Sequence, residues 1–134
     1  LPPLYVAYRA ELAEGTEVLH NDLRSRYNRR DPAVLAAIDY WASLADQVRD
    51  CLLRRDLAAI PGLLDRNFDK RREVCRISTG NLQMVEAGRS GGASAKFTGS
   101  GGAIVGTYTD EAMFAALAAR LEPMGVRVFK PRIQ

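Results

Sequence analysis

The residues best suited to chemistry lie in one glycine-rich segment, residues 91–103. Its glycines permit backbone conformations that other residues avoid, and they let a ligand approach the main chain. Successive backbone N–H groups in such a loop can bind an anion. A lysine and two hydroxyl groups at the same place add charge and hydrogen-bonding capacity. The predicted contact residues are Lys96, Thr98, Gly99, Ser100, Gly101 and Gly102.

Other kinds of glycine-rich segment compete with an anion site. A dinucleotide fingerprint requires a strand, then glycines, then a helix, whereas here a strand follows the glycines. A Walker-A loop ends in Gly-Lys followed by Ser or Thr, and that ending is missing from the sequence. A glycine-rich hairpin connection without a ligand fits the residues equally well. For Lys96, contact with phosphate and simple exposure to solvent are both open.

The elements that position this segment follow from apolar periodicity. Strands are predicted at residues 4–8, 95–98, 103–108 and 126–129, and helices at residues 31–55, 56–75, 81–89 and after Thr109-Asp110. Residues 13–30 are polar and predict a loop with at most a turn or two of helix. The order β-α-α-α-β-β-α-β predicts an α+β domain, with helices packed on one antiparallel sheet.

Length and charge exclude several classes of protein. The 134 residues suit one domain that spans residues 1–134, and no apolar run is long enough to cross a membrane. The net charge of +3 comes largely from arginine, which suits carboxylate or phosphate contacts, although solvated helix faces account for most of these side chains. The modest charge and the missing aromatic sheet motif argue against a nucleic-acid partner.

The cysteines and the single histidine give no sign of a metal site. Cys51 and Cys75 lie in helical patterns without metal-ligand spacing, which predicts two buried thiols in a reducing cytoplasm. His20 alone indicates neither a metal nor a general base. Leu1 has the character of a cut edge of a longer polypeptide.

The segment Gly-Ala-Ser-Ala-Lys-Phe-Thr-Gly-Ser-Gly-Gly-Ala at residues 92–103 resembles the third conserved motif of the GHMP superfamily of small-molecule kinases. Residues 5–9, 20–27 and 67–72 extend the resemblance to nearly the whole chain. Within the superfamily, the chain is most similar to glucuronokinase and its sugar-1-kinase relatives. The resemblance implies the C-terminal domain of such a kinase, with a ferredoxin-like α+β fold.

The resemblance also implies what lies elsewhere in such a protein. The family's phosphate loop, Pro-x-x-x-Gly-Leu-Gly-Ser-Ser-Ala, and its catalytic aspartate and lysine belong to an N-terminal domain that is absent from this chain. ATP and Mg²⁺ are therefore expected to bind mainly to that domain, and no catalytic residue is expected here. Since phosphoryl transfer depends on positioning and charge neutralisation, the isolated chain is expected to be inactive.

The resemblance falls on further polar residues that suit an acidic sugar. The predicted substrate-binding residues are His20, Arg24, Arg26, Asp69 and Arg72. One arginine of residues 20–27 is expected to bind a carboxylate bidentately, worth about 1.5–3 kcal/mol. The alternatives are pairs of these arginines with Glu14, Glu17 or Asp22. Arg72 is expected to follow Phe68 toward the interior or a pocket, or else to pair with Asp69 within the helix.

Several functions stay open at this stage. The first is a sugar-1-kinase that acts on a hexuronate with Mg-ATP. The second keeps the fold and changes the acceptor to galactose, a heptose phosphate or mevalonate. The third is a non-catalytic domain that senses a sugar or binds a partner. If the N-terminal domain normally covers the loop face, the exposed chain is expected to self-associate through its apolar surface as a homodimer.

Overall fold

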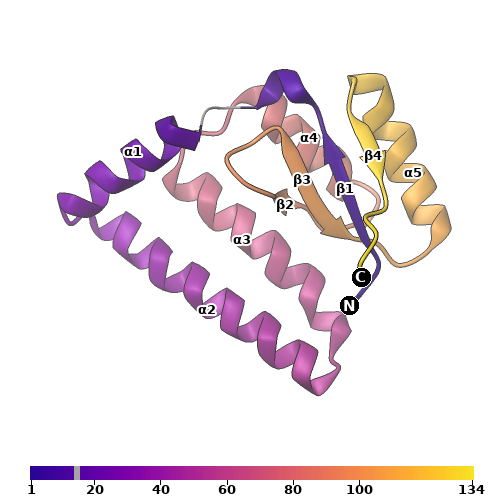
Figure 1. The fold of residues 1–134 in the computed structure, drawn as a ribbon, viewed down its shortest axis with the longest axis horizontal. Coiled ribbons are helices and arrows are strands. Elements are labelled where there is room, and N and C mark those ends of the chain that lie inside the picture. The colour runs from indigo at the N-terminus through magenta and orange to yellow at the C-terminus, as the bar shows by residue number, and fades with distance from the viewer. Residues whose placement is uncertain (14–15) are drawn as a thin grey trace.

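The computed structural model describes residues 1–13 and 16–134. It has the expected α+β architecture, in which helices pack against one antiparallel sheet (Figure 1). The strands are β1 (Leu4–Tyr8), β2 (Lys96–Phe97), β3 (Ala103–Thr107) and β4 (Arg127–Phe129). The helices are α1 (Thr16–Asn28), α2 (Pro32–Arg54), α3 (Ile60–Val74), α4 (Thr79–Arg89) and α5 (Glu111–Leu121). Short 3-10 turns cover Ala10–Leu12, Leu57–Ala59 and Glu122–Met124.

Strand β1 is a central strand of the sheet. The strand order is β2-β3-β1-β4, and each neighbouring pair is antiparallel. The β1–β3 register runs from Leu4 opposite Thr107 to Tyr8 opposite Ala103. Strands β2 and β3 form a hairpin, so the glycine-rich segment becomes the loop at one end of the sheet.

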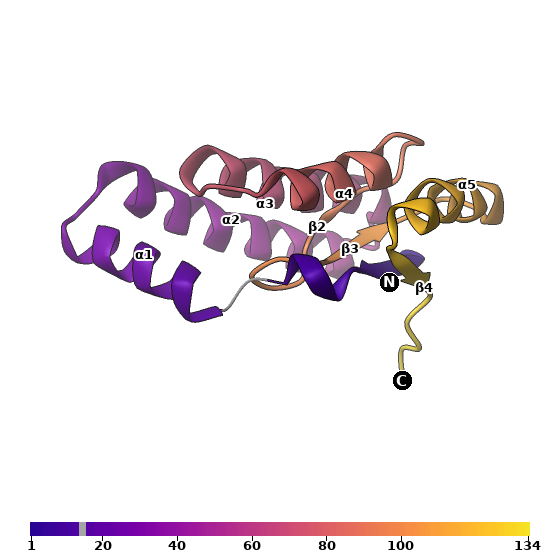
Figure 2. The ribbon, with the colours of Figure 1, turned by 90° about the horizontal axis from the view of Figure 1, so that it is seen from above.

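Alternation along the strands gives the sheet one buried face. Tyr5, Ala7 and Ile104 are fully buried on that face, because successive side chains of a strand point to opposite sides. They pack with Phe68 of α3 and Leu117 of α5 in the main core. Figure 2 shows α3 and α4 together as one layer over the sheet, and Figure 1 shows α5 beside β4.

Helix α2 begins and ends as its sequence predicts. The Asp31 side chain accepts a hydrogen bond from the Ala33 N–H, and Pro32 occupies the first helical position. The helix ends at Arg55, which has left-handed backbone angles. Helix α2 then packs along α3 through a second core of Leu44, Cys51, Ile60 and Leu63. Trp41, predicted to be core, is half-buried beside it and donates to the Asn67 carbonyl at 3.1 Å.

The prediction of a loop at residues 13–30 is wrong, because α1 is a helix of 13 residues. Its apolar stripe is short: Leu19 and Leu23, four residues apart, line a hollow with Trp41 of α2 and Cys75. Most of the remaining side chains are polar and face solvent, which hid the helical period. The chain therefore contains one helix more than predicted between β1 and β2.

The structure agrees with the absence of a spanning segment in the sequence. Within residues 1–13 and 16–134, none of the helices has the length and apolar character that a bilayer crossing requires.

Candidate functional site

The glycine loop, residues 98–102, joins β2 to β3 and lies on the side of the sheet where α3 ends (Figure 1). The Thr98 N–H donates to the Ala103 carbonyl at 3.1 Å and closes the hairpin at the base of the loop. Thr98 and Gly99 are exposed, whereas Gly102 is buried. The loop therefore has an exposed tip and a fixed base.

Asn81, in the first turn of α4, fixes the base of the loop. Its Oδ1 accepts from the Gly102 N–H at 2.8 Å, and its Nδ2 donates to the Leu12 carbonyl at 3.1 Å and to Ser78 Oγ at 2.8 Å. Asn81 is itself buried, so these bonds satisfy a side chain that would otherwise be costly to bury. At the same point the Arg9 N–H donates to the Gly102 carbonyl at 2.8 Å.

Gly102 is the loop position that requires glycine. Its φ of +81° lies in the left-handed region, and an added Cβ would lie 2.8 Å from the backbone of Ala13. The close approach of the loop to the segment after β1 therefore depends on the missing side chain.

Arg71, near the end of α3, contacts the exposed part of the loop. Its Nη1 donates to the Gly99 carbonyl at 2.5 Å, and its Nη2 donates to the Ser100 carbonyl at 3.0 Å. The guanidinium lies 4.7 Å from the centre of the Phe97 ring, which buttresses it by a cation–π contact. One arginine thus connects α3 to two successive peptides of the loop.

Two hollows lie beside α1 and the end of α3, and only the smaller one is lined by a residue of the loop. One, of about 270 Å³, is lined by Val18, Leu19, Asp22, Cys75, Arg76 and Ser78. A smaller one brings Arg71, Arg76 and Asn81 together with Ser100. Among the described residues, none forms a hydrogen bond or an ion pair with the Arg76 guanidinium. Because α4 begins at this place, its first backbone N–H groups add to a positive potential that favours anions.

Lys96 is half-buried in β2. Its burial therefore does not decide between the two alternatives predicted for it, contact with phosphate and exposure to solvent. Its ammonium donates to the Phe97 carbonyl at 2.9 Å. Burial lowers the pKa of Lys96, and repulsion by Arg71 lowers it further. Lys96 and Arg71 are thus close enough for their positive charges to repel each other beside the loop.

The structure separates the predicted residues of α1 from one another. His20 and Arg24 are exposed, four residues apart on the outer side of the helix. Arg26 points inward, where it donates to Asp31 at 2.9 Å and also bonds the Val74 carbonyl. The bond to Asp31 raises the pKa of Arg26. Arg26 thus ties α1 to the start of α2 and the end of α3, a structural role.

Of the alternative pairs expected for these arginines, one is present. Arg26 Nη1 lies 3.5 Å from an Asp22 oxygen, in the i,i+4 arrangement. Glu14 and the side chain of Glu17 lie outside the part of the chain that the structure describes. The pairs predicted with these two residues therefore stay predictions.

Asp69 and Arg72 lie on the face of α3 that meets α4. Asp69 accepts from Arg89 at 2.7 Å. Arg72 is exposed and stands 3.9 Å from Glu86, so its predicted path toward the interior is wrong. Helical geometry explains the difference: residue 71, not residue 72, shares the inner side with Phe68 and Cys75. Neither Asp69 nor Arg72 contacts the glycine loop.

The sequence analysis therefore missed Arg71, Asn81 and Arg76. A stripe with steps of four, three and four residues (Leu64, Phe68, Arg71, Cys75) was present in the sequence and leads to Arg71. Asn81 begins a similar buried stripe with Met84, Val85 and Gly88. The role of Arg76 follows only from where α3 ends, and no sequence signal marks it.

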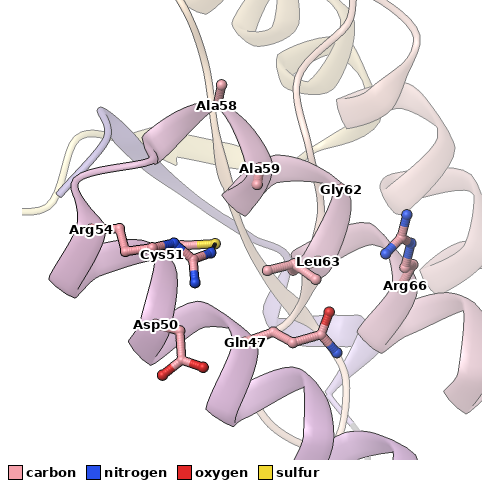
Figure 3. Close-up of a pocket in the computed structure, with 9 residues that line it drawn as sticks. All are labelled: Gln47, Asp50, Cys51, Arg54, Ala58, Ala59, Gly62, Leu63 and Arg66. Carbon is pink, nitrogen blue, oxygen red and sulfur yellow. Dashed lines mark hydrogen bonds between the residues drawn. The ribbon is translucent and has the colours of Figure 1, made fainter.

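Another hollow, of about 460 Å³, lies at the elbow between α2 and α3 (Figure 3). Arg54 reaches across it to within 4.0 Å of Cys51 Sγ, and Arg66 stands at the far side. The two guanidinium groups do not converge in Figure 3, and residues of the glycine loop take no part in the lining. We therefore place the candidate site at the loop and not at the elbow.

A metal site is not evident in the part of the chain that the structure describes. Within it, no three side chains of histidine, cysteine, aspartate or glutamate lie close enough together to hold an ion. Cys51 is buried and Cys75 is half-buried, and both are unpaired thiols.

Sequence comparison relates the chain to two plant enzymes. It is 39% identical over 109 residues to "Probable glucuronokinase 2" of Arabidopsis thaliana, covering 78% of this chain and 29% of the relative. It is 38% identical over 109 residues to "Glucuronokinase 1" of the same plant, covering 78% of this chain and 30% of the relative. The chain thus spans less than a third of the length of these relatives. No family model matches the chain.

Solved structures share the fold at low sequence identity. L. major mevalonate kinase, in complex with R-mevalonate, gives a TM-score of 0.83 at 19% identity, covering 100% of this chain and 44% of that one. A protein from Listeria innocua gives 0.84 at 14% identity, covering 100% and 41%. Mevalonate kinase from methicillin-resistant Staphylococcus aureus gives 0.63 at 14% identity, covering 97% and 42%. The chain is thus similar in sequence to part of two glucuronokinases, and it shares its fold with part of two mevalonate kinases.

Proposed function

We propose that this glucuronokinase-like domain is the substrate- and phosphate-contacting half of an ATP-dependent sugar-1-kinase that acts on a hexuronate. One observation carries the proposal: a glycine loop fixed at its base by Asn81 lies beside two guanidinium groups, those of Arg71 and Arg76. Such a surface is suited to anions, and both the transferred phosphoryl group and a hexuronate carboxylate are anions. The glucuronokinase relatives support the choice of acceptor.

In this proposal the γ-phosphoryl group moves from ATP to the anomeric hydroxyl of the sugar. The P–O bond to ADP breaks, a P–O bond to the sugar forms, and the hydroxyl proton is released. The glycine loop contacts the phosphoryl oxygens, while Lys96 adds positive charge behind the loop. Charge neutralisation and positioning of this kind are the main protein contributions to phosphoryl transfer.

Arg76 takes the carboxylate-binding role that Arg24 and Arg26 had in the sequence analysis. Arg76 lines the small hollow beside Ser100 of the loop, whereas Arg26 is occupied by Asp31. His20 and Arg24 reach a sugar only if it extends over the outer side of α1. Asp69 and Arg72 do not contact the loop. Each pairs with a residue of α4 and so helps to hold α3, the helix that carries Arg71, in place.

The rest of the kinase lies outside this chain in the proposal. An N-terminal domain, its main partner, binds most of the ATP and Mg²⁺, and Mg²⁺ neutralises charge on the phosphates. The whole enzyme works in the cytoplasm, and the isolated chain is inactive. Without that domain the chain forms a homodimer, and a monomer mass that is independent of concentration in sedimentation would contradict this expectation.

The test is ADP release by the polypeptide lengthened to span the glucuronokinase relatives, with Mg-ATP and each of four acceptors: glucuronate, galacturonate, galactose and mevalonate. We expect turnover with glucuronate and its loss in Gly101→Val, since φ at Gly101 is +139° and a side chain there meets Asn81 at 3.3 Å. Gly62→Ala is the matched control, because Gly62 lies in α3 outside the loop and nothing lies within 4 Å of an added Cβ there.

The outcomes separate the functions. Turnover with glucuronate that is lost in Gly101→Val and kept in Gly62→Ala supports the kinase and the place of the loop in its site. Turnover with mevalonate or galactose alone keeps the kinase and overturns the acceptor. A folded full-length protein without turnover on any acceptor contradicts the kinase and favours a sugar sensor.

A further inference from the structure

The contact between Arg71 and the glycine loop has a geometric consequence. Two neighbouring carbonyl oxygens, those of Gly99 and Ser100, point toward the same guanidinium. In an extended strand, successive carbonyl groups point in opposite directions. Arg71 therefore holds this part of the loop in a turn-like conformation in which both peptides face α3.

The direction of the carbonyls fixes the direction of the N–H groups. The described chain has no cis peptide bond, and across a planar trans peptide the N–H points opposite to the C=O. The N–H groups of Ser100 and Gly101 belong to the two peptides whose oxygens contact Arg71. The Gly101 N–H is thus directed to the side of the loop opposite α3, where it can donate to an anion.

We infer that Arg71 is a positioning residue, which holds the Gly99 and Ser100 carbonyls so that the Gly101 N–H is directed toward a phosphate-like anion. The inference rests on the proposed function for the identity of that anion, the transferred phosphoryl group. Arginine suits the task because its planar fork supplies two donors in a fixed geometry, whereas a lysine ammonium is a single point charge.

The Phe97 ring and the hairpin make the arrangement stiff. The ring lies under the guanidinium at 4.7 Å, and Phe97 is itself buried against Phe68 at a centroid distance of 5.1 Å. The hydrogen bond from the Thr98 N–H to the Ala103 carbonyl fixes the chain immediately before the two peptides that Arg71 contacts. Donors that are fixed before the ligand arrives lose little on reorganisation, which is why preorganised donors are effective in catalysis.

The experiment follows the Gly101 N–H directly in the full-length protein. Serine labelled with ¹³C at the carbonyl and glycine labelled with ¹⁵N select only Ser-Gly pairs in a carbonyl-filtered spectrum. Within residues 1–134 the only such pairs are Ser90-Gly91 and Ser100-Gly101. The probe is inorganic tripolyphosphate, and the Gly91 signal is the internal control.

We expect tripolyphosphate to shift the Gly101 signal and to leave Gly91 in place. In Arg71→Met the Gly101 shift is expected to fall at least threefold at the same probe concentration. Arg71→Lys keeps the charge and loses the fork, so it is expected to behave like Arg71→Met. Arg66→Met, on the same helix and outside the contact, keeps the full shift.

The inference is overturned if Gly101 does not respond in the unmodified protein. It is also overturned if Gly101 responds equally in Arg71→Lys while thermal unfolding shows that variant to be folded. In the ADP assay, Arg71→Lys is expected to lower kcat by roughly 10²-fold, the effect of misplacing one transition-state donor, with KM for the sugar within about threefold. If no acceptor is turned over but Gly101 responds as described, the proposed function fails and the inference stands.

Discussion

Gly102→Ala is the substitution whose effect the structure specifies in most detail. Gly102 has φ +81°, and the new Cβ would lie 2.8 Å from the Cα and N of Ala13. A left-handed conformation costs a residue with a Cβ about 1–2 kcal/mol. Displacing a packed backbone segment costs about 1–3 kcal/mol more. The native state of Gly102→Ala is therefore destabilised by about 2–5 kcal/mol.

Gly99→Ala in the same loop is the reference variant, because it measures the effect that a Gly→Ala change has on the unfolded chain. Any Gly→Ala change restricts the unfolded chain and stabilises the protein by about 0.4–1 kcal/mol. At Gly99 nothing lies within 4 Å of the added Cβ and φ is not in the positive range, so that gain is expected alone. The unfolded-state effect cancels in the difference, and the two variants should differ in unfolding free energy by about 2–5 kcal/mol.

Urea unfolding followed by the fluorescence of Trp41, the only tryptophan, measures this difference. Equal m-values are required, since a changed slope indicates a changed denatured or native state. Midpoints that place both variants within about 0.5 kcal/mol of each other would refute the reasoning, because they would mean that the contact with Ala13 does not constrain the loop.

Two further changes test the scaffold. Gly62→Ala in α3 is expected to raise the free energy of unfolding by roughly 0.5–1 kcal/mol, since nothing lies within 4 Å of the new Cβ and alanine favours helix; a lower melting temperature would contradict this. Asp31→Asn is expected to lower the melting temperature at pH 7 by an amount that shrinks below about pH 4. Arg26 lowers the pKa of Asp31, so the stabilisation is present above the unfolded pKa and is lost as pH falls through the folded one; a pH-independent difference would be the contrary result.

The elements with strong local signals were predictable. Asp31-Pro32 placed the start of α2, and the Asp110 side chain caps α5 by accepting from the Met113 N–H at 2.8 Å. The glycine-rich segment was found from composition, and it forms the β2–β3 loop as expected. In these cases neighbouring residues determine the conformation, so a local pattern is sufficient.

The elements that depend on distant partners were not predictable. Helix α1 has a weak stripe and is held in part by Arg26, which bonds the carbonyl of Val74, 48 residues away. Arg71 lies within the helix predicted at residues 56–75, but its role was not predictable because its loop partners are 28 and 29 residues away. The pairing of β1 with both β3 and β4 has no local signature either, since any of the strands could occupy the centre.

The central position of β1 has a consequence for the order in which the protein folds. Four α-helices separate β1 from its partner β3 in the chain, and α5 as well precedes its other partner, β4. The Tyr5 hydroxyl also donates to the carbonyl of Ser94, 89 residues away. During synthesis the helices can form locally, while β1 waits with both edges unpaired until β3 leaves the ribosome. Folding dominated by such long-range pairing is slow, and unpaired strand edges aggregate. The nascent chain is therefore most vulnerable after α4 has emerged and before residue 107 is available to complete the ladder.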